Sequence, residues 1–163
     1  MKRLLIILTL FLSSNELLAE HITGGEIYYT YLGMAGPNHR YRITLKLFRH
    51  CGNIGAPLDN EAALAIFTKP GNSIFRQTEA PLRERRELRL RTPGPCITNA
   101  PEVCYEVGYY DWEVELPASA QGYTISYQRC CRINGISNLV GSSNLGATYT
   151  AEIPGNSMHP EGP

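Results

Sequence analysis

The stretch RYRITLKLFRH at positions 40–50 decides the fold class of this chain. Its odd-numbered positions from 41 to 47 are apolar, and its even-numbered positions from 40 to 46 are polar or charged. An extended strand places alternate residues on opposite faces. One face of this strand is therefore predicted to be buried and the other to face water. The predicted buried set is Tyr41, Ile43, Leu45 and Leu47.

The same alternation recurs along the chain, clearly in three further stretches and weakly in five. Turn residues such as Pro70-Gly71-Asn72 and Asn134-Gly135 separate these stretches. A single helical turn is predicted only at 59–65. The pattern as a whole predicts an all-β, antiparallel β-sandwich, Ig-like or jelly-roll-like and stabilised by disulfides. The clear strands are 110–116, 123–127 and 147–153, and the weak ones are 26–32, 63–68, 73–76, 88–91 and 103–107.

Composition narrows the class of protein further. The chain has 163 residues, with 15 Lys and Arg balanced by 15 Asp and Glu. This length fits one domain, and zero net charge argues against a nucleic-acid partner. The 15 Gly and 11 Pro argue against a helical bundle.

The N-terminus predicts export. Lys2 and Arg3 precede the apolar run 4–12, and Ala19 is a small residue at a suitable cleavage point. We therefore predict a signal peptide at 1–19 and a secreted or cell-surface protein without a membrane span in the mature chain. An uncleaved anchor is the alternative. The β-sandwich module is predicted at 20–153, and the Pro- and Gly-rich segment 154–163 reads as a linker or a truncated end.

The five cysteines are the most specific chemical signal in the chain. An exported chain meets an oxidising compartment, so disulfides are expected. Cys96 and Cys104 flank a short loop and are predicted to pair with each other. Cys51 is predicted to pair with Cys131, with Cys130 left over, although the two adjacent cysteines are nearly equivalent candidates. The spacing of Cys and His does not fit a zinc site.

The irregular segment 132–146 is a candidate contact loop, because a loop this long in a compact domain is functional, mobile or tied down. Its polar side chains are the candidate contact residues: Arg132, Asn134, Asn138 and Asn144.

Catalytic and cofactor motifs are weak. The acidic row Asp111, Glu113 and Glu115 could supply a glycosidase pair, but a solvated strand face opposite the basic row of 40–46 explains it better. The Arg-rich stretch 83–91 contains interleaved Glu and predicts a mixed charged face. The group 59–61 could ligate calcium but lacks further oxygen donors. We therefore expect no enzyme activity and no cofactor.

Four runs resemble a known family: HITGGEI (21–27), YRITLKLFR (41–49), YQRCCRINGISNL (127–139) and GATYTAEIP (146–154). Together they are similar to the N-terminal module of large secreted surface proteins of gliding bacteria, often labelled gliding-motility-associated or PKD-domain-containing. The resemblance implies export by type IX secretion, further Ig-like or PKD-type modules downstream, and a surface role without known catalytic residues.

These observations favour a non-enzymatic module with a structural or adhesive role, the first module of a larger surface protein. Its partners would be other surface modules or an extracellular glycan or protein. A carbohydrate-binding module is the alternative, suggested by the Asn-rich loop and by tyrosines such as Tyr28 and Tyr109 that need not face the core. A secreted glycoside hydrolase is a weaker one.

Overall fold

The computed structural model describes residues 22–52, 57–89, 94, 96–99, 102–130, 132–133 and 135–155. The predicted signal peptide at 1–19 and the segment from 156 onward lie outside the described residues. The described chain forms strands joined by turns, with one short 3-10 helix, Ser142–Asn144. The strands are β1 Ile22–Ala35, β2 Asn38–His50, β3 Glu61–Thr68, β4 Ile74–Arg89, β5 Cys104–Leu116, β6 Tyr123–Arg129 and β7 Ala147–Ile153.

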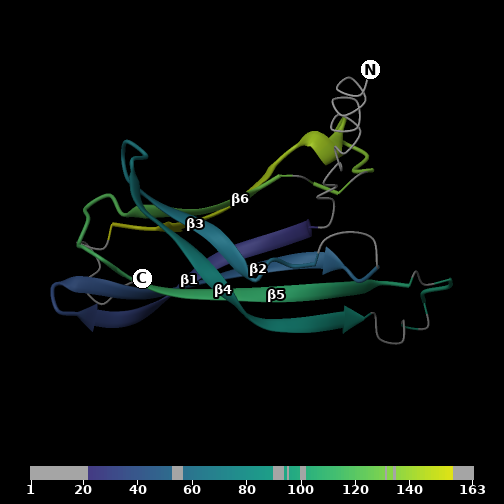
Figure 1. The fold of residues 1–163 in the computed structure, drawn as a ribbon, viewed down its shortest axis with the longest axis horizontal. Coiled ribbons are helices and arrows are strands. Elements are labelled where there is room, and N and C mark those ends of the chain that lie inside the picture. Colours follow the sequence, from purple (N-terminus) through teal and green to yellow (C-terminus); the bar gives the residue numbers. More distant parts are fainter. Residues whose placement is uncertain are drawn as a thin grey trace, which may run out of the picture.

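All seven strands belong to one antiparallel sheet with the order β1-β2-β5-β4-β3-β6-β7. The long strand β4 connects the two halves of this sheet. Its first half, up to Pro81, pairs with β3, and its second half, from Leu82, pairs with β5. Figure 1 shows β4 running from the layer of β3 and β6 down to the layer of β5.

The two ends of the sheet come together. The strand order begins at β1 and ends at β7, and these two strands contact each other. A Cβ atom at Gly25 of β1 would lie only 3.1 Å from a ring carbon of Tyr149 of β7. The result is a nearly closed, barrel-like sheet. The all-β, antiparallel prediction is confirmed, whereas two separate sheets of a sandwich are not shown, because β4 is common to both halves.

The core fills the space inside this sheet. All four predicted inward residues of β2 are buried, and β3, β5 and β6 contribute Leu64, Tyr110 and Ile125 among others. Tyr29 and Tyr31 of β1 pack against Tyr41, with ring centroids 5.8 Å and 5.4 Å apart. Burial of these apolar faces is the main force that holds the sheet closed.

Two predictions about elements are wrong. The helical turn at 59–65 is instead the start of β3, where Ala62, Leu64 and Ile66 point into the core with a period of two. The separate strands predicted at 73–76 and 88–91 both overlap the single strand β4, which includes 74–76 and 88–89, whereas 90 and 91 lie outside the described residues. From Arg83 onward both faces of β4 are exposed, so no apolar alternation marks it as a strand.

Among the described residues, no helix is long and apolar enough to cross a membrane.

Candidate functional site

The predicted contact loop 132–146 leaves β6 and returns to β7. Asn138 and Asn144 are exposed, as predicted for contact residues. Between them Val140 is 99% exposed, a position that the sequence analysis did not single out. Asn134 lies outside the described residues.

The base of this loop is held by its own hydrogen bonds. The backbone N–H of Arg132 donates to the carbonyl of Leu145 (2.9 Å), and its guanidinium Nε donates to the carbonyl of Gly146 (3.0 Å). The buried hydroxyl of Ser142 donates to the carbonyl of Ile133 (2.9 Å). Arg132 therefore helps to close the loop, and Ser142 does so as well, although nothing in its local sequence predicts burial.

The disulfide prediction is wrong in its pairing. Cys51 is bonded to Cys104, with their Cα atoms 5.3 Å apart, and Cys96 is free and exposed. The physical reason is the β2–β5 ladder, which pairs His50 with Tyr105 and so brings the end of β2 beside the start of β5. This long-range register is invisible in the chain, where Cys96 and Cys104 look like natural neighbours.

The assignment of Cys130 as the leftover thiol is also wrong. Cys130 is disulfide-bonded. Its partner lies outside the described residues, as does Cys131, the predicted partner of Cys51.

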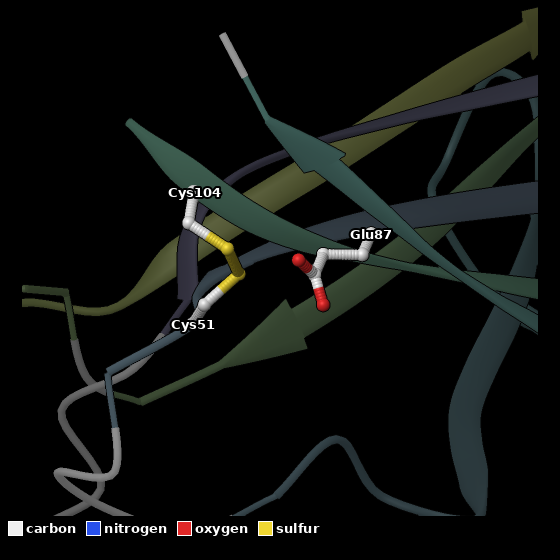
Figure 2. Close-up of side chains that lie close together, drawn as sticks. All are labelled: Cys51, Glu87 and Cys104. Atoms are coloured by element: carbon white, nitrogen blue, oxygen red, sulfur yellow. A yellow bond between two sulfur atoms is a disulfide. The ribbon is translucent and has the colours of Figure 1, made fainter. Parts of the chain in front are cut away.

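Figure 2 shows the carboxylate of Glu87, on β4, facing the Cys51–Cys104 disulfide. One potential ligand atom from each of these residues lies within 4.8 Å of the others. A metal ion binds cysteine as thiolate, and here both sulfurs are already joined to each other. The arrangement is therefore a disulfide beside an exposed carboxylate, and it offers no set of metal ligands in its oxidised form.

The acidic row of β5 forms cross-strand pairs with the basic row of β2. Glu113 lies opposite Arg42 and Glu115 opposite Arg40. Arg42 donates to Glu113 at 2.8 Å, and this hydrogen bond lowers the pKa of the Glu113 carboxyl below its usual range. The hydroxyl of Thr44 donates to Asp111 at 2.7 Å. A glycosidase acid needs a raised pKa, so Glu113 has the opposite property.

The Arg-rich stretch of β4 is a mixed charged face. Arg86 pairs with Glu84 at 2.5 Å, and Arg89 pairs with Glu87. The hydrogen bond from Arg86 lowers the pKa of Glu84. Each basic group of these two pairs thus has a carboxylate partner two residues away on its own strand.

The group 59–61, a possible set of calcium ligands, is held against β5 and β6 by hydrogen bonds to Asp59. The carboxylate of Asp59 accepts a hydrogen bond from Arg129, and its backbone carbonyl accepts one from the hydroxyl of Tyr110 at 2.8 Å. Burial raises the pKa of Tyr110 well above its usual range. The role of Asp59 that these contacts show is structural.

A hollow of about 660 Å³ lies on the outer face of β3, β4 and β6. We call it the outer hollow. Most of its lining comes from outward positions of the three strands, and Thr78 and the core residue Leu64 also contribute. No local sequence pattern predicts it, since its residues come from three separate strands. Its outward lining includes Ala63, Ala65, Phe67, Ile74, Gln77, Glu79, Ser126 and Gln128.

Comparison with known proteins gives no family for this chain: no family model, no curated protein and no solved structure matches it.

Proposed function

We propose that this chain is a non-enzymatic, secreted or cell-surface β module with a structural or adhesive role, the first module of a larger surface protein. The proposal includes the resemblance to gliding-motility-associated and PKD-domain-containing proteins, together with the finer β-sandwich class, Ig-like or jelly-roll-like. Two layers of strands around one core, joined through β4, support that class (Figure 1).

The observation that carries the proposal is the Cys51–Cys104 disulfide, which joins the end of β2 to the start of its neighbour β5. Structural disulfides persist in oxidising compartments and are rare in the cytosol. Their presence agrees with the signal peptide predicted at 1–19. Cys96 carries a free, exposed thiol, so a thiol reagent added to the oxidised chain should label Cys96 and leave Cys51 and Cys104 unlabelled.

The contact loop supports an adhesive role. Its hydrogen-bonded base holds a tip on which Val140 is almost fully exposed, next to the exposed Asn138. An ordered loop that displays apolar and amide groups costs less entropy on binding than a disordered one. Partners of this loop would be other surface modules or an extracellular protein or glycan.

Export is tested by producing the full chain in a bacterium and separating periplasmic, surface and cytosolic fractions. We expect an exported product that begins at Glu20 and carries the Cys51–Cys104 bridge, as read by N-terminal sequencing and non-reducing mass spectrometry. An uncleaved, fully reduced chain confined to the cytosol would contradict the proposal.

Adhesion is tested separately by coating beads with the exported chain and measuring their attachment to cells and to abiotic surfaces. We expect Val140→Asp to reduce attachment, because it places a charge at the tip of the loop. The matched control is Leu88→Asp, which changes an exposed apolar residue on β4. Equal attachment of the two variants and the unchanged chain would argue against the loop.

The carbohydrate-binding alternative is favoured by a different observation, the outer hollow. The hydrolase alternative is disfavoured by the lowered pKa of Glu113.

A further inference from the structure

We propose that the outer hollow binds a neutral oligosaccharide. This inference deepens the carbohydrate-binding alternative stated above and rests on it. It assigns that binding to a face formed by three strands, away from the contact loop.

The floor of the hollow is made of small side chains. Strand pairing places Ala63 opposite Glu79 of β4, and Ala65 between Gln77 of β4 and Ser126 of β6. Because each alanine has only a methyl group, the longer side chains on either side stand above it as walls. The resulting space of about 660 Å³ can accept more than one sugar ring.

Ser126 provides a polar group that lacks a partner inside the protein. Its residue is only 6% exposed, and its hydroxyl makes no hydrogen bond. It nevertheless lines the hollow. Buried polar groups are nearly always hydrogen-bonded, and an exception calls for an explanation. Because this oxygen is covered in the free chain, a ligand hydroxyl would satisfy it once a neighbouring side chain of the walls moves aside.

The remaining lining fits a neutral polyol. Gln77 and Gln128 offer amide donors and acceptors, and Glu79 offers a carboxylate acceptor. Among the described residues that line the hollow none is Lys or Arg, so an anionic ligand would gain no counter-charge. Phe67 and Ile74, paired at one end, offer an apolar surface to the C–H face of a sugar ring.

The test uses the full chain as exported and folded, with cellohexaose, xylohexaose, mannohexaose and chitohexaose as neutral probes and a heparin hexasaccharide as the anionic one. Binding is measured by isothermal titration calorimetry, and the site is located by amide chemical shifts. We expect at least one neutral hexasaccharide to bind and to shift amides of β3, β4 and β6, with no binding of the heparin hexasaccharide.

Two variants test the site itself. Ala63→Tyr fills the hollow from an exposed position, and we expect it to weaken binding by about tenfold or more. Ser126→Ala removes the hydroxyl and adds no bulk, and we expect a loss of about three- to tenfold. The matched control is Ala118→Tyr, which adds the same ring at an exposed alanine that does not line the hollow.

The outcomes separate the proposals. Absence of binding to every hexasaccharide would overturn both this inference and the carbohydrate-binding alternative, whatever the result of the export test. Binding that Ala63→Tyr and Ser126→Ala leave unchanged would overturn the assignment to the outer hollow alone. Preferred binding of the heparin hexasaccharide would overturn the neutral class. A further outcome is that the chain binds no sugar but self-associates, and that Ala63→Tyr abolishes this self-association. This result would assign the hollow to a second copy of the chain and would overturn the oligosaccharide proposal.

Discussion

At the scale of single residues, Gly122 shows how local conformation and packing combine. It precedes β6 with φ +83°, a conformation that L side chains rarely adopt. A Cβ atom at this position would clash with the carbonyl oxygen of Ile153, at the end of β7. Its carbonyl also accepts the backbone N–H of Lys69 at 3.3 Å. Gly122 therefore lets three chain segments meet at one end of the sheet.

We predict that Gly122→Ala lowers the free energy of unfolding by more than about 3 kcal/mol, because strain and a backbone clash add together. Gly36→Ala is the matched control, since its φ of +61° is also positive but nothing lies within 4 Å of the added carbon. It should cost only about 1–2 kcal/mol. Urea denaturation measures both variants. Equal losses would show that the clash at Gly122 contributes nothing.

The pairs Arg42–Glu113 and Arg86–Glu84 predict a pH dependence. Hydrogen bonds from the arginines lower the pKa of both carboxyls in the folded protein. The unfolded chain, with Glu near its reference pKa of about 4.3, then binds more protons in acid than the folded chain does. The stabilisation by both pairs is therefore complete above the unfolded pKa and is lost as the pH falls through the folded pKa.

The measurement compares urea midpoints from pH 7 to pH 2 for the unchanged chain and for the double variant E84Q/E113Q. We expect the double variant to have the flatter profile. Because both pairs are exposed to solvent, 1 M NaCl should reduce the difference. Superimposable profiles at low salt would contradict the predicted linkage.

At the scale of elements, the Cys51–Cys104 bridge fixes the end of β2 to the start of β5, two neighbouring interior strands of the sheet. The bridge spans 53 residues, including the whole of β3 and β4. Closing so long a loop removes considerable entropy from the unfolded chain.

We predict that the double variant C51S/C104S loses about 4 kcal/mol of stability, from the chain-entropy relation for a loop of this length. Cys96→Ser is the control and should change stability by less than about 0.5 kcal/mol, because Cys96 is free and exposed. Denaturation without reductant measures both. A smaller loss from C51S/C104S than from Cys96→Ser would be inconsistent with the observed pairing.

At the scale of the whole molecule, the sheet is closed by side-chain contacts between β1 and β7. Tyr149 of β7 reaches Gly25 of β1 and stacks on Tyr127 of β6, with ring centroids 6.2 Å apart. By contrast, β2 and β5 each lie between two hydrogen-bonded neighbours. Stability should therefore fall from the centre of the sheet toward its two ends.

We predict that amide hydrogen exchange is slowest in β2 and β5 and fastest, among the strands, in β1 and β7, because edge strands open without global unfolding. Gly25→Val should increase exchange in β1 and β7 while leaving β5 nearly unchanged, since the added side chain meets Tyr149 of β7 as well as Lys46 and Leu47 of β2. Gly24→Val is the control, with open space around the added carbon. Exchange and its location are measured by mass spectrometry of peptic fragments.

Much of the fold could be predicted from local patterns. The strand at 40–50 and the inward sets of β5, β6 and β7 follow from alternation, because a half-buried strand must sort its side chains by face. The strand predictions fail in two segments, the second half of β4 and the start of β3. The second half of β4 has two exposed faces and carries no alternation. The Ala-rich start of β3 has helical propensity, which the burial of Leu64 and Ile66 overrides.

The candidate sites were harder to predict. The exposure of Asn138 and Asn144 agrees with the predicted contact loop. Arg132 instead donates a hydrogen bond at the base of the loop, and the exposed Val140 is not among the predicted contact residues. The outer hollow could not be predicted from the sequence, because Gln77, Ala65 and Ser126 are far apart in the chain and become neighbours only through strand pairing.

By itself, the sequence determined the all-β class, the antiparallel strands and the buried face of each strongly alternating strand, because these depend on residues within one element. Only the tertiary structure decided that β4 joins both halves of one curled sheet, that Cys51 pairs with Cys104, and that an unpaired Ser126 lines a hollow. These features depend on the register between distant strands. Register is fixed by burying all the inward faces at once, a condition that no single segment of the chain contains.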